Sequence, residues 1–269
     1  MKIGFIGGGN MAGAMIGGML KQGYAAEEIG VAEPHEERRH WLAREFGIFT
    51  EAAANVVLGS DLLILAVKPQ VLRAVLTPLP RLPATSCVLS IAAGVRAGDI
   101  ARWLQDHAAV VRAMPNTPAL VGAGITGLFA LPGVSTEQKA RVEQALKTVG
   151  QVVWVAEESM IDAVTAISGS GPAYIFLFIE ALEAAALELG FSADAARTLA
   201  LHTVYGSAAL AVQDGSDPAV LRARVTSKGG TTERGVAALE EHGVRQAVLA
   251  AACAAAARAR ELGDLLGAE

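Results

Sequence analysis

A glycine-rich turn between an apolar run and a helical pattern constrains the fold of this 269-residue chain more than any other feature. The segment reads Ile3-Gly-Phe-Ile-Gly-Gly-Gly-Asn-Met-Ala12 and has the spacing G-x-G-x-x-A at Gly7, Gly9 and Ala12. After a strand, Gly7 permits a tight turn, Gly9 lets a ligand approach the backbone, and Ala12 allows a helix to pack closely on the strand. The segment therefore predicts the first β-α-β unit of a doubly wound sheet.

Short β-rich runs alternate with helical patterns over the first 155 or so residues, which is typical of parallel strands joined by crossover helices. We expect strands at residues 2–6, 29–32, 61–67, 86–91, 109–112, 125–130 and 151–155. We expect helices at residues 10–22, 35–46, 69–76 and 135–149. Ser135 and Gln138 have the spacing of a capping box, which predicts where the last of these helices begins.

From about residue 159 the pattern changes to long helical segments rich in alanine and leucine, which predicts an all-helical second part. Ser192 is placed to cap the start of one of these helices. The alanine-rich stretch 247–259 has too little apolar area for a stable helix alone, so we expect it to pack against another subunit. The predicted boundaries are 1–157 for the α/β domain and 158–269 for the helical domain.

Composition excludes several classes of protein. Hydrophobic residues make up 52% of the chain and charged residues 18%, so the chain has ample material for a core. The 22 Lys and Arg against 27 Asp and Glu give a net charge of −5, which argues against a nucleic-acid binder. Cys87 and Cys253 lie far apart without metal-ligand spacing, so we expect no disulfide and no metal site.

We also expect no membrane segment. The longest uncharged run, residues 163–179, is interrupted by Gly169, Ser170, Gly171 and Pro172, which is unfavourable for a spanning helix. The N-terminus enters an apolar strand pattern without the features of a signal peptide, so the expected location is cytoplasmic.

The glycine turn also predicts a ligand, because the N-terminus of the following helix attracts phosphate. Dinucleotide binding is therefore expected at Gly7, Gly8, Gly9, Asn10, Met11 and Ala12. Glu33 follows the second strand, where an acidic residue hydrogen-bonds an adenosine ribose and disfavours a 2′-phosphate. Arg38 and Arg39 follow closely and offer a phosphate two cations, so the choice between NADH and NADPH stays open.

Four further segments combine Pro or Gly with small hydroxyl residues: Ala66-Val-Lys-Pro-Gln70, Met114-Pro-Asn-Thr-Pro118, Ser168-Gly-Ser-Gly-Pro-Ala-Tyr174 and Thr226-Ser-Lys-Gly-Gly-Thr-Thr232. Together with the glycine turn, these segments resemble pyrroline-5-carboxylate reductase, the enzyme of the last step of proline biosynthesis. The resemblance runs from Ile3 to about Ala257. It implies a Rossmann-type doubly wound sheet followed by an all-helical domain for dimerisation and substrate binding, with dimers that can assemble further into a decamer.

The resemblance assigns the cofactor residues. The turn from Gly7 to Ala12 cradles the pyrophosphate of NADPH or NADH. Ala66, Val67, Lys68 and Pro69 line its ribose and nicotinamide side, and Met114, Pro115, Asn116 and Thr117 hold the nicotinamide. Members of the family often have an asparagine before the AVKP strand. Here Ala53 takes the aligned position and Asn55 follows two residues later, so Asn55 is the candidate for that adenosine contact.

The resemblance also assigns the substrate residues, in a site that includes groups contributed across a dimer. The residues Ser227, Gly229, Gly230, Thr231 and Thr232 would receive the carboxylate and ring nitrogen of 1-pyrroline-5-carboxylate. Hydride transfer to the C=N carbon then gives L-proline. A protonated imine is a strong electrophile, so positioning and a hydrogen bond can suffice; the Thr232 hydroxyl is the candidate for contact with the ring nitrogen, and Ser168 and Ser170 would shape the pocket beside the nicotinamide.

Two alternatives stay open on the residues alone. A β-hydroxyacid dehydrogenase or another imine reductase shares this domain order. The dehydrogenase, however, would place a lysine on a helix of the second domain, and Lys228 is the only lysine after Lys147 and lies in the glycine loop. A non-catalytic sensor that binds the dinucleotide would also explain the glycine turn. It would, however, leave the loops of the second domain without a role. Lys68, which follows an apolar strand, is expected to orient the cofactor.

Overall fold

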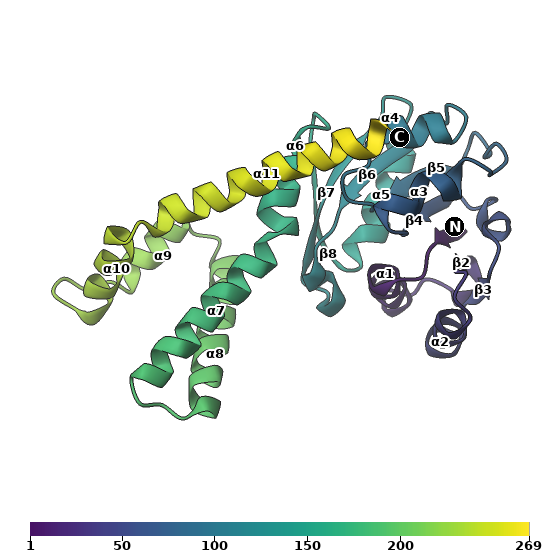
Figure 1. Ribbon diagram of the computed structural model, residues 1–269. Coiled ribbons are helices and arrows are strands. Elements are labelled where there is room, and N and C mark those ends of the chain that lie inside the picture. Colours follow the sequence, from purple (N-terminus) through teal and green to yellow (C-terminus); the bar gives the residue numbers. More distant parts are fainter. Residues whose placement is uncertain (269) are drawn as a thin grey trace. The chain divides into compact units, whose positions relative to one another are not determined.

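The computed structural model describes residues 1–268 and divides into two compact units (Figure 1). The sheet unit comprises Met1–Ser170 and the segment from Cys253 onward, and the helical unit comprises Gly171–Ala252. These units differ from the expected division at residue 157, because residues 158–170 pack on the sheet and the end of the chain returns to it. That two domains meet at residue 157 and fold separately stays a prediction.

The sheet unit has an eight-stranded sheet in the order β3-β2-β1-β4-β5-β6-β7-β8. The strands are β1 (Ile3–Ile6), β2 (Ile29–Ala32), β3 (Phe49–Glu51), β4 (Leu62–Leu65), β5 (Cys87–Ser90), β6 (Val110–Met114), β7 (Gly124–Ala130) and β8 (Gly150–Trp154). Every paired strand is parallel to its neighbour except β6 with β7. The predicted α/β fold class with a Rossmann-type sheet is confirmed.

Helices cover both faces of this sheet, and the alternation of apolar residues shows why. Ile3 and Phe5 of β1 belong to one buried cluster, whereas Ile6 belongs to the other. The first cluster includes side chains of α1 (Asn10–Lys21), α2 (Glu36–Phe46) and α5 (Thr136–Lys147). The second includes side chains of α3 (Pro69–Leu76) and α4 (Ala97–Trp103). The strands are therefore buried on two sides, as parallel strands require.

The start of α5 follows the predicted capping box. The Ser135 hydroxyl accepts from the Gln138 amide at 3.2 Å, and the Gln138 side chain accepts from the Ser135 amide at 2.9 Å. Short 3-10 turns complete the sheet unit at η1 (Ala26–Glu28), η2 (Ala54–Val57) and η3 (Thr117–Val121).

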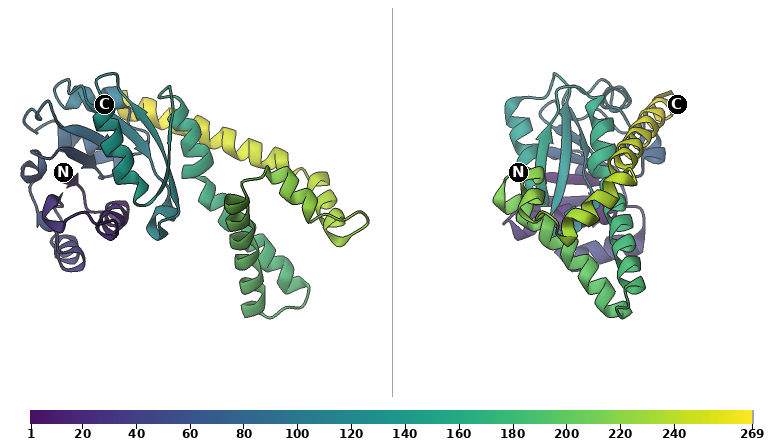
Figure 2. Two further views of the ribbon diagram at one scale, coloured as in Figure 1. Left: turned by 180° about the vertical axis from the view of Figure 1, so that it is seen from behind. Right: turned by 90° about the vertical axis from the view of Figure 1, so that its left-hand side faces the viewer.

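The helical unit contains α7 (Gly171–Glu188), α8 (Ala193–Asp214), α9 (Pro218–Arg224), α10 (Thr231–Glu241) and the first part of α11 (Val244–Ala268). Figure 2 shows α7 and α8 side by side as a helical hairpin. Ser192 caps α8 as predicted, because its hydroxyl accepts from the Ala195 amide at 3.4 Å. The second half of α11 belongs to the sheet unit, where Leu262 and Leu266 lie against Gly94.

The expectation that residues Gly169–Pro172 prevent one long apolar helix is wrong. The chain stays helical from α6 (Met160–Val164) through a π-helical turn, Thr165–Gly169, into α7. Pro172 lies in the first turn of α7, where its missing amide hydrogen costs little. The resulting helix, Met160–Glu188, is long and apolar enough to cross a membrane by length and composition, with a mean hydropathy of 1.3. A helix that packs against a second chain can be equally long and equally apolar.

Candidate active site

The glycine turn lies where the order of strands in the sheet reverses. From β1 the chain proceeds to β2 and β3 on one side and then crosses to β4 on the other. Ligands of doubly wound sheets bind in the crevice at the carboxyl ends of such strands. Gly7 follows β1 with a φ of +97°, and a Cβ there would lie 2.7 Å from the Ala66 carbonyl oxygen beyond β4. A side chain at this position is excluded by both the backbone conformation and the space.

The rest of the turn divides into packed and open positions. A Cβ on Gly8 would meet Leu42 at 2.5 Å, and Ala12, in the first turn of α1, is fully buried. Gly9 precedes α1 and has nothing within 4 Å of a Cβ, and no side chain caps the helix. Asn10 is exposed and Met11 is partly buried. Free amide groups at the start of α1 thus face open space at Gly9, as the cradle of a phosphate requires.

Glu33 lies directly after β2 and is 7% exposed. Its Oε2 accepts from the Gly8 amide at 2.8 Å, and its Oε1 accepts from the His35 amide at 3.0 Å. The carboxylate therefore joins the end of β2 to the glycine turn. The spacing of these residues in the sequence gives no sign of this contact.

The two arginines at the start of α2 contact the glycine turn and the loop after β2. Arg38 donates to the carbonyl oxygens of Gly8 and Gly9, and its guanidinium lies 4.1 Å from the centre of the Trp41 ring. Arg39 Nη1 donates to the carbonyl oxygen of Glu33 at 3.0 Å and to that of Pro34 at 2.7 Å. Neither side chain simply extends into solvent from the helix.

The segment after β4 lies across the crevice from the glycine turn. The Ala66 amide donates to the Ile6 carbonyl at 2.8 Å, which places the end of β4 beside the end of β1. Lys68 precedes α3 and is exposed, and Pro69 occupies the first turn of that helix. Asn55 is also exposed, in η2, which packs on β1 and β2.

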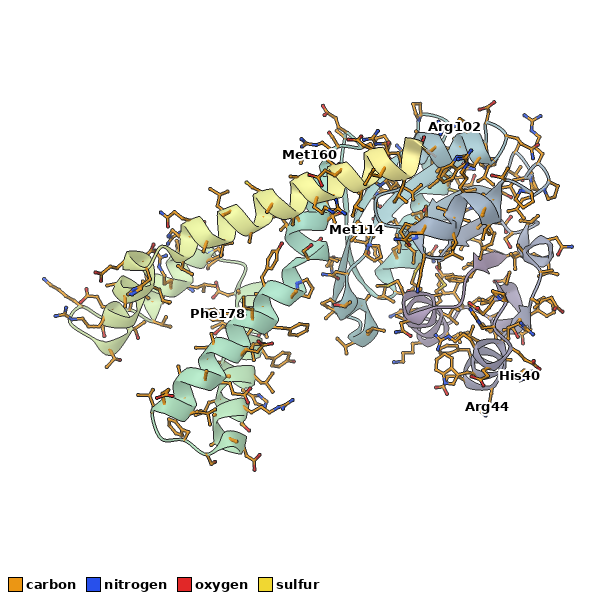
Figure 3. All side chains as sticks on the ribbon, in the orientation of Figure 1. His40, Arg44, Arg102, Met114, Met160 and Phe178 are labelled. Atoms are coloured by element: carbon orange, nitrogen blue, oxygen red, sulfur yellow. The ribbon has the colours of Figure 1, made fainter. Side chains whose placement is uncertain are left out.

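Asn116 connects two of the predicted motifs. It is 8% exposed, its Oδ1 accepts from the Ile125 amide at 2.9 Å, and its Nδ2 donates to the Ser168 carbonyl at 3.1 Å. Met114 at the end of β6 (Figure 3) lies so close to Gly169 that a Cβ on that glycine would be 2.6 Å from the Met114 methyl group. Pro115 is buried and Thr117 is exposed.

The π-helical turn places the serines of the same motif. The Ser170 amide donates to the Thr165 carbonyl at 2.7 Å, which is the wide hydrogen bond of a π turn. The Ser168 hydroxyl donates to the Val164 carbonyl at 3.0 Å, so it is bound to its own helix. Such turns occur often at functional sites. No acid or base contacts either hydroxyl in the described residues, so neither serine is activated as a nucleophile.

A buried ion cluster holds α6 in place beside this motif. Arg112 on β6 is 3% exposed and pairs with Glu158 at 3.3 Å and with Asp162 at 3.2 Å. Glu158 also accepts from the Ala97 amide at 2.7 Å. The cluster lies two residues before Met114 along β6. No sequence motif reveals it, because its members are dispersed along the chain.

The predicted substrate loop lies in the helical unit, before α10. Its two glycine amides are occupied: Gly229 donates to Glu233 Oε2 at 2.7 Å, and Gly230 donates to the Ser227 carbonyl at 3.0 Å. Thr231 and Thr232 form the exposed first turn of α10, and no side chain caps that helix. The donors that remain open to an anion are thus on the two threonines. Glu233 is an acid that the motif did not reveal, since it lies just beyond it.

The structure brings most predicted residues of the sheet unit to one edge of the sheet. The glycine turn, Glu33, the segments 66–69 and 114–117, and the serine motif all follow the carboxyl ends of strands or contact residues that do. The loop 227–232 belongs to the other unit. Within residues 1–268, no group of His, Cys, Asp and Glu residues could hold a metal ion.

Sequence comparison finds two families along the chain. Residues 2–94 match NADP oxidoreductase, coenzyme F420-dependent, and residues 158–262 match pyrroline-5-carboxylate reductase dimerisation. A pyrroline-5-carboxylate reductase from Pseudomonas aeruginosa is 43% identical over 268 residues, with 99% of this chain and 98% of that protein covered.

Two solved structures are similar along nearly their whole length. The pyrroline-5-carboxylate reductase from Coxiella burnetii has a TM-score of 0.90 and 39% identity, covering 97% of this chain and 98% of that one. The pyrroline carboxylate reductase from Plasmodium falciparum, with NADP bound, has a TM-score of 0.85 and 27% identity, covering 98% of each chain. The resemblance noted in the sequence is therefore confirmed, and this chain belongs to the pyrroline-5-carboxylate reductase family.

Proposed function

We propose that this protein reduces 1-pyrroline-5-carboxylate to L-proline, the last step of proline biosynthesis, with NADPH or NADH as the reductant. The observation that carries the proposal is the chemistry of the residues beside the expected nicotinamide. Met114–Thr117 and Ser168–Ser170 contain no acid or base. That composition suits a protonated C=N bond, which needs positioning and not a strong general acid. Membership of the reductase family supports the same reaction.

The sheet unit fits a dinucleotide because Gly9 leaves open space beside the uncapped start of α1. We assign the pyrophosphate to the turn from Gly7 to Ala12 and the adenosine side to Glu33 and Asn55. The segments 66–69 and 114–117 line the ribose and the nicotinamide. Lys68 is exposed at the start of α3, where its charge helps to orient the phosphates and ribose. When bound, the reduced nicotinamide supplies the hydride for the C=N carbon.

In the helical unit, Ser227, Gly229, Gly230, Thr231 and Thr232 form the substrate loop. The uncapped start of α10 presents the Thr231 and Thr232 amides to the substrate carboxylate. The Thr232 hydroxyl contacts the ring nitrogen and holds its proton while the C=N bond is reduced. Glu233 keeps the loop in shape by accepting from Gly229. Ser168 and Ser170 shape the pocket beside the nicotinamide.

The active form is a homodimer, and dimers assemble further into a decamer. The match of residues 158–262 to a dimerisation family supports pairing of this region with a second copy. The large exposed apolar side chains of α7 and α8 supply the surface for it, including Phe176, Leu177, Leu201 and Tyr205. The same pairing accounts for the apolar helix Met160–Glu188 without a membrane. We place the enzyme in the cytoplasm and expect no nucleic-acid partner.

The test is oxidation of NADPH and of NADH, each followed at 340 nm with 1-pyrroline-5-carboxylate, together with identification of the product. Formation of proline establishes the reaction. Binding of both dinucleotides without turnover would reject it and would favour a reductase of another imine or a dinucleotide sensor. Oxidation of a 3-hydroxy acid with NADP+ or NAD+, without reduction of the imine, would favour the β-hydroxyacid dehydrogenase.

A further inference from the structure

We propose that Glu33 makes this protein selective for NADH over NADPH, because it fixes a carboxylate of the protein where a 2′-phosphate would need to bind. The inference rests on the proposed function only through the dinucleotide site. In folds of this kind, the residue after the second strand contacts the adenosine ribose at its 2′ position. Glu33 holds that position directly after β2.

The contacts of Glu33 give the first argument. The Gly8 amide in the glycine turn and the His35 amide just before α2 both donate to the Glu33 carboxylate, at 2.8 Å and 3.0 Å. Because Glu33 is only 7% exposed, its carboxylate is held in place and cannot swing into solvent. An incoming phosphate would find these donors occupied and a negative charge beside it, whereas a ribose hydroxyl can donate to that charge.

The arginines give the second argument, since they were the groups that left the choice of cofactor open. Arg38 is held by the carbonyl oxygens of Gly8 and Gly9 and lies over the Trp41 ring. Arg39 is held by the carbonyl oxygens of Glu33 and Pro34. Arg38 therefore stabilises the glycine turn, and Arg39 stabilises the loop after β2. A guanidinium that moved away to follow a phosphate would lose these contacts.

The charge around the position gives the third argument. Glu36 and Glu37 are exposed in the first turn of α2, next to Glu33 in sequence. Three carboxylates thus accompany the two arginines over residues 33–39, and the local charge is negative. A phosphate carries close to two negative charges at neutral pH, so its approach is opposed.

The experiment is equilibrium binding of NADH and of NADPH by isothermal titration calorimetry, without imine, at one ionic strength. We expect the Kd of the wild-type protein for NADH to be at least about tenfold lower than that for NADPH, given two like charges in a partly buried site. Glu33→Gln keeps the shape and removes the charge, so it should bring the two Kd values to within about threefold of each other. Glu45→Gln, with the same charge change at the other end of α2, should leave their ratio unchanged.

Equal or tighter binding of NADPH by the wild-type protein would overturn the inference, and this comparison needs no variant to fold. An unchanged ratio in a folded Glu33→Gln protein would overturn it as well. Arg39→Gln provides a further arm, because selective loss of NADPH binding there would mean that Arg39 reaches the phosphate. Since no imine is present, selective NADH binding without later turnover would reject only the proposed reaction.

Discussion

Gly7 and Gly9 lie two residues apart and have different surroundings, so their substitution should have different effects. Gly9→Val should weaken NADH binding by about 100-fold, or about 2.7 kcal/mol, because the side chain would enter the open space beside α1. The protein should keep its thermal stability. Gly7→Ala should instead cost more than about 1 kcal/mol of folding free energy, since Gly7 has a positive φ and touches Ala66.

Calorimetric titration and thermal unfolding of both variants separate these effects. Normal NADH affinity in Gly9→Val would contradict the assignment of this turn to the pyrophosphate. Wild-type stability in Gly7→Ala would contradict the packing described at the crevice.

Thr232→Val should lower kcat/KM by about 10- to 100-fold, because the substitution removes one hydrogen bond to a charged ring nitrogen. The Kd for NADH should stay the same, since Thr232 lies in the helical unit. Steady-state kinetics and calorimetry on the same preparation test both statements. Thr77→Val, an exposed threonine at the far end of α3, is the matched control and should behave as wild type.

His107 should make the protein less stable in mild acid. Burial lowers the pKa of His107, the nearby Arg81 lowers it further, and the hydrogen bond with the Ser86 carbonyl partly opposes the shift. Its folded pKa therefore lies below the unfolded value of about 6.5, so the unfolded chain binds the proton first. Stability then falls as the pH decreases below about 6.5, by at most about 1.4 kcal/mol per pH unit.

Urea unfolding at pH 7.5, 6.0 and 5.0 tests this prediction against His107→Gln, which has no titrating group. The wild-type protein should lose more stability than the variant over that range. Equal losses would show that other groups account for the acid sensitivity.

At single positions, the role of a residue can be predicted from the sequence when one local backbone requirement, such as a turn or a helix cap, explains the choice of residue. Gly7 and Ala12 meet the expected turn and packing, and Ser135 and Ser192 cap the expected helices. The sequence does not reveal contacts between residues that are distant along the chain. Arg112 with Asp162 is one such contact, and Glu33 with Gly8 is another.

At the level of elements, Asn116 should couple the loop after β6 to the π-helical turn. Asn116→Ala leaves the Ile125 amide and the Ser168 carbonyl without partners, which should cost about 1–3 kcal/mol of stability. It should also lower kcat, because Met114 and the serine motif lose their fixed spacing. Hydrogen exchange at Ile125 should accelerate. The Val155 amide, which donates to Leu128 at 2.8 Å, is the internal reference and should not change.

Unchanged exchange at Ile125 would mean that the Asn116 side chain does not hold the loop. A stability loss without any change in kcat would assign Asn116 to folding alone.

The elements that the sequence predicts best are those with a clear apolar pattern or a capping motif. α3 and β2 begin and end as expected, and β1 and α5 differ from the expected ranges by two residues or fewer at either end. β3 was missed because its three residues include the exposed Phe49 and Glu51 and show no buried face. The strand β7 was expected at residues 125–130, but its antiparallel direction was not. Only residues 115–123 separate it from β6, too few for the crossover that a parallel pair needs.

The whole molecule should depend on a second copy for its activity. In the single chain Leu177 is 66% exposed and Tyr205 is 73% exposed, an amount of apolar surface that soluble monomers rarely leave open. Phe176, 58% exposed on α7, belongs to the same surface. Phe176→Asp should shift the protein from dimers and larger assemblies to monomers in sedimentation velocity, with loss of turnover, because a charge cannot be buried there without a partner.

Phe49→Asp on β3 is the matched control, since Phe49 is 55% exposed on the edge strand of the sheet unit. It should leave the assembly as in the wild type. NADH binding measured on the Phe176→Asp protein separates assembly from folding, because the dinucleotide residues lie in the sheet unit. A monomer that binds NADH and no longer forms proline is the expected result. A fully active monomer would show that each chain carries a complete substrate site and would remove the second copy from the mechanism.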